Sequence, residues 1–342
     1  MRRSTRFGLI VVVGLLVLVG AYTTYWWMVG ERIKQGIVAW QQSESSRKID
    51  ASWRNLRVTG FPLKFRVEID DAVLSGRAWS PPPELHFPRL SGAVRPWNFN
   101  NWRLSAPQGL SGDLAASGSR PLFKLVAPRA KGTASLTREG GGWLWLNLEN
   151  IAAELPGATP IKSADVWIIL PAAAPKTGRE ASFGLALDVR QIQVQSPPAN
   201  FSNTIDRGAL GLTVKGAVPD GPLVRSIAAW RDAGGTIEVD NLRLEWGDLG
   251  VTANGTVALD RELQPIAAFS ADIEGFATII NALVSVDGLT PEQGSLIQIA
   301  LSMLAKPGPD GRPRIAVPFT IQNSKMYLGP ARLGPAPRIV WE

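Results

Sequence analysis

The sequence lacks cysteine altogether and contains a single histidine among its 342 residues. Without cysteine, the chain has no disulfide, no thiol nucleophile, no CxxC redox pair and no cysteine-ligated zinc. With one histidine, it has no metal site built from several histidines. Histidine is the side chain that most often serves as a general base, and His86 is the only one in the sequence. These absences exclude several common kinds of enzyme and metalloprotein.

Recognisable catalytic motifs are also scarce. Neither a G-x-S-x-G nucleophile elbow nor a phosphate-binding P-loop occurs. The segment Ser45-Ser46-Arg47-Lys48 fits S-x-x-K and Lys176-Thr177-Gly178 fits K-T-G, but no serine or tyrosine has an asparagine two residues later, so the third motif of the penicillin-binding enzymes is missing. We interpret both matches as chance, because Ser45 ends an expected helix and Lys176 lies in a proline-rich loop.

The remaining candidates for acid-base chemistry are weak. Asp70 and Asp71 are adjacent, yet neighbours on a strand point to opposite faces and cannot share a metal ion or a substrate. His86 lies between Pro83 and Pro88, which is typical of an ordinary loop histidine. We therefore predict no catalytic, cofactor-binding or metal-binding residues, and a chain that is not an enzyme.

Negative charge is slightly under-represented, which gives a formal net charge of +7. Seven basic and two acidic residues lie at or before Lys48, so this segment alone carries +5. The rest of the chain has 29 basic and 27 acidic residues, which is close to balance. Because binding of DNA or RNA requires clustered positive charge on the binding domain, we predict no nucleic-acid partner.

Against this background, the segment Phe7 to Val29 contains no charged side chain. Its 23 residues meet the requirement of roughly 20 for a helix that crosses a bilayer. Three arginines precede it, and two tyrosines and two tryptophans lie near its far end. Arginine favours the cytoplasmic side and aromatic residues favour the interface, so we predict a bilayer span with a cytoplasmic N-terminus and the bulk of the chain outside the cytoplasm.

A cleavable signal peptide is the alternative to a retained anchor. Val19, Gly20 and Ala21 resemble a small-residue processing site. The apolar run continues past Ala21 into the aromatic residues, which makes it longer than the apolar region of a signal peptide. Retention of the helix is therefore the favoured interpretation, and export follows from either one.

The helix is expected to continue beyond the span. Ile33, Ile37 and Trp40 recur at helical spacing, which predicts a helical collar to about Glu44. The collar either lies on the membrane surface or packs against its own domain. We favour packing.

From Ala51 onward the hydrophobic period changes to two. In Leu63 to Asp70 the odd positions are apolar and the even positions charged, which predicts a strand with one solvated face. Gly60-Phe61-Pro62 precedes this strand and is expected to interrupt pairing. Similar alternation recurs around Leu146, Leu187, Leu212, Val239, Leu244, Ala271 and Val317.

Helices are expected near 222–233 and 291–305, and Phe276 to Val286 is a candidate for a third. The first begins with a proline in its first turn and ends at Gly234-Gly235. The second begins with Thr290 to Gln293, which fits a capping box. Its hydrophobic residues lie almost all round the helix, so we expect it to be covered on more than one side.

These elements predict a mainly β fold with a few helices, in which a transmembrane helix precedes a long twisted antiparallel sheet packed by two or three helices. Residues 1–45 are interpreted as cytoplasmic stub, anchor and juxtamembrane helix. Residues 46–170 and 181–342 are interpreted as two β-rich halves, and the proline-rich residues 171–180 as the seam between them.

One strand is apolar on both faces. Trp143 and Trp145 alternate with Leu144 and Leu146. Such a strand lies between two layers, or faces a partner, lipid or ligand. Core burial is the favoured interpretation, and an apolar groove or partner surface is the functional alternative.

Several motifs resemble the exported family catalogued as domain of unknown function 2125 (DUF2125). They are Trp53, Gly60-Phe61-Pro62-Leu63-Lys64-Phe65, Pro96-Trp97-Asn98, Ala228-Ala229-Trp230-Arg231-Asp232-Ala233-Gly234-Gly235, Leu244-Glu245-Trp246-Gly247 and Leu328-Gly329-Pro330. The resemblance covers nearly the whole chain and implies a Gram-negative inner-membrane anchor with a periplasmic domain. It brings no catalytic residues. Its motif residues here are Gly60, Phe61, Pro62, Trp230, Arg231, Gly234 and Gly235.

The run Gly255 to Asp260 and the strand after it are similar, at the level of fold, to AsmA-like envelope proteins. That likeness implies a curved sheet with an apolar interior associated with lipid. We expect a non-enzymatic protein that shelters a lipid or hydrophobic ligand on an apolar sheet face. The alternatives are a scaffold that binds envelope proteins through sheet edges and an envelope hydrolase.

Overall fold

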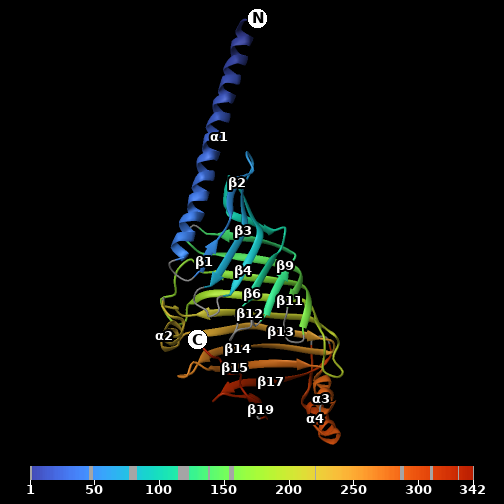
Figure 1. The fold of residues 1–342 in the computed structure, drawn as a ribbon. Coiled ribbons are helices and arrows are strands. Elements are labelled where there is room, and N and C mark those ends of the chain that lie inside the picture. The colour runs from blue at the N-terminus through green and yellow to red at the C-terminus, as the bar shows by residue number, and fades with distance from the viewer. Residues whose placement is uncertain are drawn as a thin grey trace.

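The computed structural model describes residues 2–45, 49–76, 83–114, 123–137, 139–153, 158–219, 221–285, 289–308, 311–329 and 331–341. One long helix, α1 (Arg2–Ser45), projects from a body formed by a large antiparallel sheet (Figure 1). The expected helix thus runs without a break from the apolar segment through the collar. A mainly β fold behind an N-terminal apolar helix is confirmed.

The described part of the chain contributes 19 strands to this sheet. They are β1 (Ile49–Ser52), β2 (Asn55–Thr59), β3 (Phe65–Gly76), β4 (Glu84–Arg95), β5 (Asn98–Ala106), β6 (Leu110–Leu114), β7 (Phe123–Ala127), β8 (Arg129–Leu136), β9 (Gly142–Ala153), β10 (Ala158–Leu170), β11 (Ala181–Val194), β12 (Thr204–Lys215), β13 (Thr236–Trp246), β14 (Leu249–Leu259), β15 (Pro265–Glu274), β16 (Lys306–Pro307), β17 (Pro313–Gln322), β18 (Lys325–Leu328) and β19 (Ala331–Pro335).

Successive antiparallel pairing orders most of the sheet. β3 pairs with β2, β1 and β4, and the strands from β8 to β15 pair with their successors before β17, β18 and β19 complete the far end. Between β4 and β9 the sheet forks, because β5 and β8 bridge them at one end and β6 and β7 at the other. Short connections favour this neighbour-to-neighbour topology.

Residues directly opposite each other in an antiparallel sheet share a face, so the register shows what each face presents. One row of opposed residues consists of Val58, Val67, Gly92, Leu104, Gly132, Leu146, Val166, Leu187, Leu210, Leu242, Ala253, Ala271 and Val317. We call the face that contains this row the apolar face. It is apolar from β2 to β17.

The adjacent row belongs to the opposite face, which we call the polar face. Its members are Arg57, Glu68, Ser91, Ser105, Lys131, Asn147, Asp165, Asp188, Ala209, Arg243, Thr252, Asp272 and Ala316. Each is a chain neighbour of one residue in the apolar row. The strict alternation of the sequence therefore produces two chemically distinct faces.

Buried hydrophobic residues form two clusters, and Phe65, Val67 and Val94 are buried in β3 and β4 as well. One contains Leu110, Ala127, Ile151, Ala153 and Ala164, where β6 and β7 approach β9 and β10. The other contains Leu249, Ile273, Phe276, Ile280 and Ile315, where α3 (Phe276–Ser285) packs against β14, β15 and β17. Between the clusters the leucine and valine side chains of the apolar row are only half-buried.

The three shorter helices lie at the margins of the sheet. α2 (Leu223–Asp232) is at one margin, and α3 and α4 (Pro291–Leu304) are at the other (Figure 1). The predicted capping box of α4 is present, since Thr290 and Gln293 exchange side-chain and backbone hydrogen bonds. Pro222 is the N-cap residue of α2, outside the first turn, and Val286 lies outside the described residues.

The expectation that α4 would be covered on more than one side is wrong for its outer side. α4 contacts α3 and β17, but Met303 is 82% exposed and Leu296 and Leu304 are exposed as well. The apolar residues all round α4 predicted burial on several sides, whereas in the hairpin of α3 and α4 only one side of α4 is covered.

Residues 171–180, the predicted seam, connect β10 to β11, which pair along most of their length. One further expectation needs correction. The strand expected from Leu63 begins instead at Phe65, because Phe61 to Leu63 form a turn.

Proline misled the prediction for His86, which lies in strand β4 and not in a loop. Pro88 follows in the same strand, opposite Asp71, whose φ of +51° marks a break in the β3 ladder. Pro88 also lies where the other neighbour of β4 changes from β6 to β5. Proline has no N–H to donate to the ladder, and none is needed at such a break, so a proline fits at this position.

Candidate functional site

The second half of α1 lies along the first strands of the sheet. Gly30 is buried, and a Cβ built on it would contact the Val58 side chain of β2 at 3.6 Å. Farther along the helix, Gln41 donates a hydrogen bond of 2.7 Å to the carbonyl oxygen of Ala51. The collar therefore packs on its own domain, as favoured from the sequence.

Between the collar and the sheet lies an apolar groove with a volume of about 420 Å³. Ile33, Ile37 and Trp40 form the helix side with Gly36. The sheet side consists of Val67, Ile69, Leu90, Gly92, Trp102 and Leu104. Both glycines keep the groove open, because no atom lies within 4 Å of a Cβ on Gly36, and a Cβ on Gly92 would project toward Leu104 and Trp102 at 3.5 Å.

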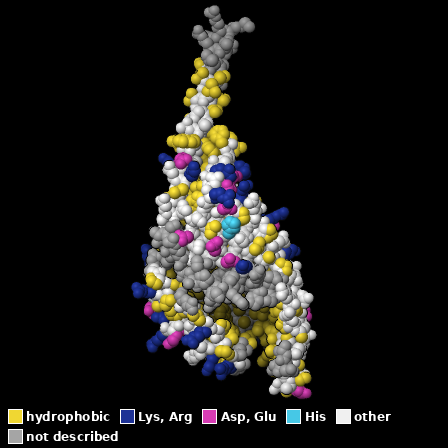
Figure 2. All heavy atoms as spheres, viewed as in Figure 1, with side chains coloured by type: hydrophobic (Ala, Val, Ile, Leu, Met, Phe, Trp, Pro, Cys, Tyr) yellow, Lys and Arg dark blue, Asp and Glu magenta, His cyan; other side chains and the backbone are white. Residues whose placement is uncertain are grey.

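This groove opens onto the apolar face. Val67, Gly92 and Leu104 line the groove and belong to the apolar row, which continues across the sheet to Val317. Figure 2 shows hydrophobic side chains in the wall of a hollow in the lower half of the molecule, where Figure 1 places β13 to β17. One continuous row of apolar residues thus leads from the collar toward the far end of the sheet.

The two-faced strand β9 divides its residues between the two faces. Leu144 and Leu146 lie on the apolar face, opposite Ile168 and Val166. Trp143 and Trp145 lie on the polar face, where the Trp145 Nε1 donates a hydrogen bond of 3.0 Å to Asp165. The four residues therefore do not form a single surface, and only the leucines lie on the apolar face.

The tryptophans of β9 instead join residues of β10 in an outer patch on the polar face. Trp143 is opposite Ile169, and Trp145 is opposite Trp167. Trp143 is 43% and Ile169 57% exposed. This outer tryptophan patch is the second apolar surface of the sheet.

The motif Gly60-Phe61-Pro62 forms the turn between β2 and β3. Gly60 has a φ of +101°, and a Cβ there would lie 2.8 Å from the Lys64 carbonyl oxygen, so the turn requires glycine. Tyr22 of α1 donates a hydrogen bond to the Pro62 carbonyl oxygen. The motif is therefore a contact between the turn and α1.

The second motif fixes α2 to the sheet. Trp230 is buried, and its Nε1 donates a hydrogen bond of 2.7 Å to the Lys215 carbonyl oxygen at the end of β12. Arg231 donates to the carbonyl oxygens of Asp260 and Arg261 in the turn after β14. Gly234 has a φ of +78°, and a Cβ on Gly235 would lie 2.3 Å from the Trp230 ring. The motif residues have structural roles.

The only histidine lies near groups that acid-base chemistry could use. His86 lines a depression of about 290 Å³ and is opposite Ser111 of β6 in the register. Its Nε2 is 3.8 Å from Asp71 Oδ1, and the same carboxylate forms an ion pair with Arg54. None of the hydrogen bonds among the described residues joins Ser111 to His86, so the pair does not have the geometry of an activated nucleophile.

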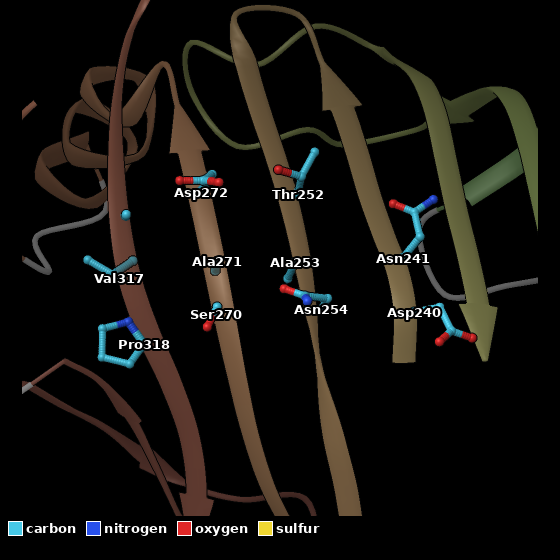
Figure 3. A pocket seen from close by; sticks show the side chains of 11 residues that line it. Asp240, Asn241, Thr252, Ala253, Asn254, Ser270, Ala271, Asp272, Val317 and Pro318 are labelled. Carbon is cyan, nitrogen blue, oxygen red and sulfur yellow. The ribbon is translucent and has the colours of Figure 1, made fainter. Parts of the chain in front are cut away.

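The polar face is held together by ion pairs. Arg57 contacts Asp70 at 2.9 Å, and Arg207 contacts Asp188 at 2.5 Å. Arg207 donates hydrogen bonds to the Asp188 carboxylate, and this interaction raises the pKa of the guanidinium above its usual value. A polar depression of about 460 Å³ crosses β13, β14, β15 and β17, and Figure 3 shows Asp240 and Asp272 on different strands of it. Within the described residues, no group of three His, Asp or Glu side chains could hold a metal ion.

Comparison with known proteins returns one family. Its description is "Uncharacterized protein conserved in bacteria (DUF2125)", and its profile matches residues 26–337. No curated protein and no solved structure matches the chain. The likeness to AsmA-like proteins is therefore without support from these comparisons.

Proposed function

The chain belongs to the DUF2125 family of bacterial proteins, and from its groove and apolar face we propose that it is a membrane-anchored, non-enzymatic protein that binds lipid. The observation that carries this proposal is the apolar row, which crosses the sheet from β2 to β17 and begins in the groove beneath α1. Lipid acyl chains are the ligand class that such a surface fits.

The free-energy cost of exposing this apolar face to water supports the presence of a bound ligand. Exposed apolar area is unfavourable by roughly 25 cal/mol per Å², and large contiguous apolar patches on soluble proteins usually mark binding sites. The middle of the apolar face has no helix packed on it within the described residues, since α3 contacts only its margin. Bound acyl chains would remove this area from water without requiring specific polar contacts.

In this proposal, the lipid comes from the membrane that α1 spans. One helix near the N-terminus is long and apolar enough to cross a membrane. Its N-terminal arginines support a cytoplasmic N-terminus and an inner-membrane span, with the sheet in the periplasm. The groove would then open close to the bilayer surface, because its helix side follows the apolar segment directly.

Native mass spectrometry of full-length protein extracted in mild detergent tests lipid binding. Leu187→Lys places a charge on the apolar face, whereas Ala186→Lys places the same charge one residue away on the polar face. We expect bound lipid in the wild type, a decrease of about tenfold in Leu187→Lys, equivalent to about 1.4 kcal/mol, and wild-type occupancy in Ala186→Lys. Circular dichroism verifies that both variants fold. Wild-type protein free of lipid, or equal losses in both variants, would contradict the proposal.

The proposed absence of enzyme activity has its own test. Full-length protein is incubated with lipid and glycan substrates, and we expect no turnover above that of the His86→Ala variant. Turnover that His86→Ala abolishes would establish the hydrolase alternative.

A scaffold for envelope proteins is the second candidate, and the outer tryptophan patch favours it. The exposed rings of Trp143 and Trp167 lie on the solvated face, where lipid in the groove could not reach them. This function predicts a stoichiometric protein partner in the same mass spectra and its loss in Trp143→Ser. Lipid without a protein partner would favour the first proposal.

A further inference from the structure

The turn between β2 and β3 contacts the apolar part of α1 as well as the collar. Trp26 stacks on Phe65 with ring centroids 5.1 Å apart, and it meets Phe61 edge-on at 5.6 Å. The Trp26 Nε1 donates a hydrogen bond of 3.3 Å to the Lys64 carbonyl oxygen. Together with the hydrogen bond from Tyr22 to Pro62, these contacts fix the turn beside the last two turns of the apolar segment.

The position of these contacts along α1 shows how far the turn extends beside the apolar segment. Tyr22 precedes the end of the apolar segment at Val29 by seven residues, and a helix rises 1.5 Å per residue, so the turn reaches roughly 10 Å back along the span. That depth corresponds to the headgroup and upper acyl region that interfacial proteins occupy.

A second turn lies at the same level. Val94 of β4 is opposite Phe65 of β3, so the turn between β4 and β5 is adjacent to the turn between β2 and β3. Trp97 in this turn is 66% exposed, and Arg95 lies over its ring at 6.0 Å. The rings of Phe65 and Phe99 are 5.6 Å apart beneath the two turns.

The outer surface of these turns is apolar where it would meet lipid. Leu63 is 67% exposed, and Phe61 is 49% exposed although the rings of Tyr22 and Trp26 lie beside it. Lys64 and Arg95 are exposed beside them and carry the charge that anionic headgroups attract. Figure 2 shows hydrophobic side chains where α1 meets the body, with Lys and Arg side chains directly below.

We propose that the two turns form a second membrane attachment, in which Phe61, Leu63 and Trp97 enter the same leaflet from which α1 emerges. This inference rests on the membrane span of the proposed function, but not on lipid binding by the groove. The attachment holds the sheet upright against the bilayer, so the groove beneath the collar faces the leaflet surface. The partner that covers these apolar side chains is the bilayer itself.

The cysteine-free sequence allows a direct measurement of depth. Full-length Leu63→Cys and Trp97→Cys are labelled with an environment-sensitive fluorophore and reconstituted into bilayers of phosphatidylethanolamine and phosphatidylglycerol. Lipids with a nitroxide on the acyl chain then quench the label. Leu16→Cys in the apolar segment is the positive reference, and Val224→Cys, an exposed residue on α2, is the negative reference. All four positions are exposed, so labelling is compatible with folding.

We expect quenching at residues 63 and 97 to exceed that at residue 224 by at least about twofold, because interfacial side chains enter the acyl boundary. Quenching at residues 63 and 97 equal to that at residue 224, with residue 16 quenched, would overturn the attachment and leave the anchor intact. Failure to quench residue 16 would overturn both. The lipid content from mass spectrometry is independent of these outcomes, so loss of the attachment is distinguishable from loss of lipid binding.

Discussion

At the scale of single residues, the two motifs Gly60-Phe61-Pro62 and Trp230 to Gly235 serve packing. Gly60 allows the turn that contacts α1, and Gly235 allows the indole of Trp230 to lie against the chain at the start of β13. His86 and Asp71 lie 3.8 Å apart, but within the described parts of the chain no hydrogen bond joins a nucleophile such as Ser111 to His86. Specific side-chain chemistry therefore maintains the architecture, whereas the candidate site consists of apolar surface.

Gly235→Ala tests this structural role. A Cβ would lie 2.3 Å from the Trp230 ring, so the ring must move and its hydrogen bond to Lys215 must lengthen. We expect a loss of about 1–3 kcal/mol, the usual cost of overpacking, measured by thermal unfolding in detergent. Gly208→Ala is the control, since no atom lies within 4 Å of its Cβ. Equal stability of the two variants would refute the role.

Glu149 provides a prediction for pH. A hydrogen bond of 2.7 Å from Lys131, and its positive charge, lower the pKa of this carboxyl below its usual value of 4.5. Because the folded pKa is depressed, the stabilisation is present above the unfolded pKa and is lost as the pH falls through the folded pKa. The Tm of Glu149→Gln should lie slightly below that of the wild type at neutral pH and coincide with it in acid. A difference that persists in acid would contradict this cause.

At the scale of elements, α1 combines two environments in one helix. Its apolar segment has the composition of a span, and its collar covers the first strands of the apolar face without filling the space beneath. α4 presents the opposite case, because its outer side is apolar and exposed although it is not part of the span. The hydrophobic pattern of a helix indicates how much of it avoids water, but not which partner covers it.

Gly36→Leu tests the groove through α1. The leucine side chain would enter the open groove, and replacing a helical glycine should stabilise α1 by about 0.5–1 kcal/mol. We expect a higher Tm together with less bound lipid in native mass spectra. Gly20→Leu is the matched control, because it makes the same change in the apolar segment, where no atom lies within 4 Å. If Gly36→Leu and Gly20→Leu retain the same amount of bound lipid, lipid does not enter through the groove.

At the scale of the whole molecule, the sheet departs from the usual two-layer domain. Two clusters of buried side chains lie near β6–β7 and α3, and Phe65 and Val67 are buried in β3 as well, whereas the apolar row between the two clusters is half-buried. A domain normally buries its apolar face against another layer. In this protein we propose that lipid acts as that layer.

Removal of lipid should therefore change the stability of the whole sheet. A ligand that binds only the folded state stabilises it by about 2.7 kcal/mol at a hundredfold excess over Kd. Delipidated full-length protein should unfold at a lower temperature than protein to which phospholipid is restored, and Leu187→Lys should show little difference between the two conditions. Identical unfolding of the wild type with and without lipid would argue against lipid as a structural layer.

The sequence alone determined the apolar helix, the alternation of the strands and the capping box of α4, because these signals arise from residues close together along the chain. Only the tertiary structure decided that Leu146, Val166 and Leu187 share a face while Trp145 lies on the other. Strand pairing joins distant segments, and the same alternating pattern fits many partners and either register, so the pattern could not specify the apolar row. The groove was equally hidden, since it requires α1 to contact β1 and β2 and to pass over β3, β4 and β5, an arrangement set by packing and not by period.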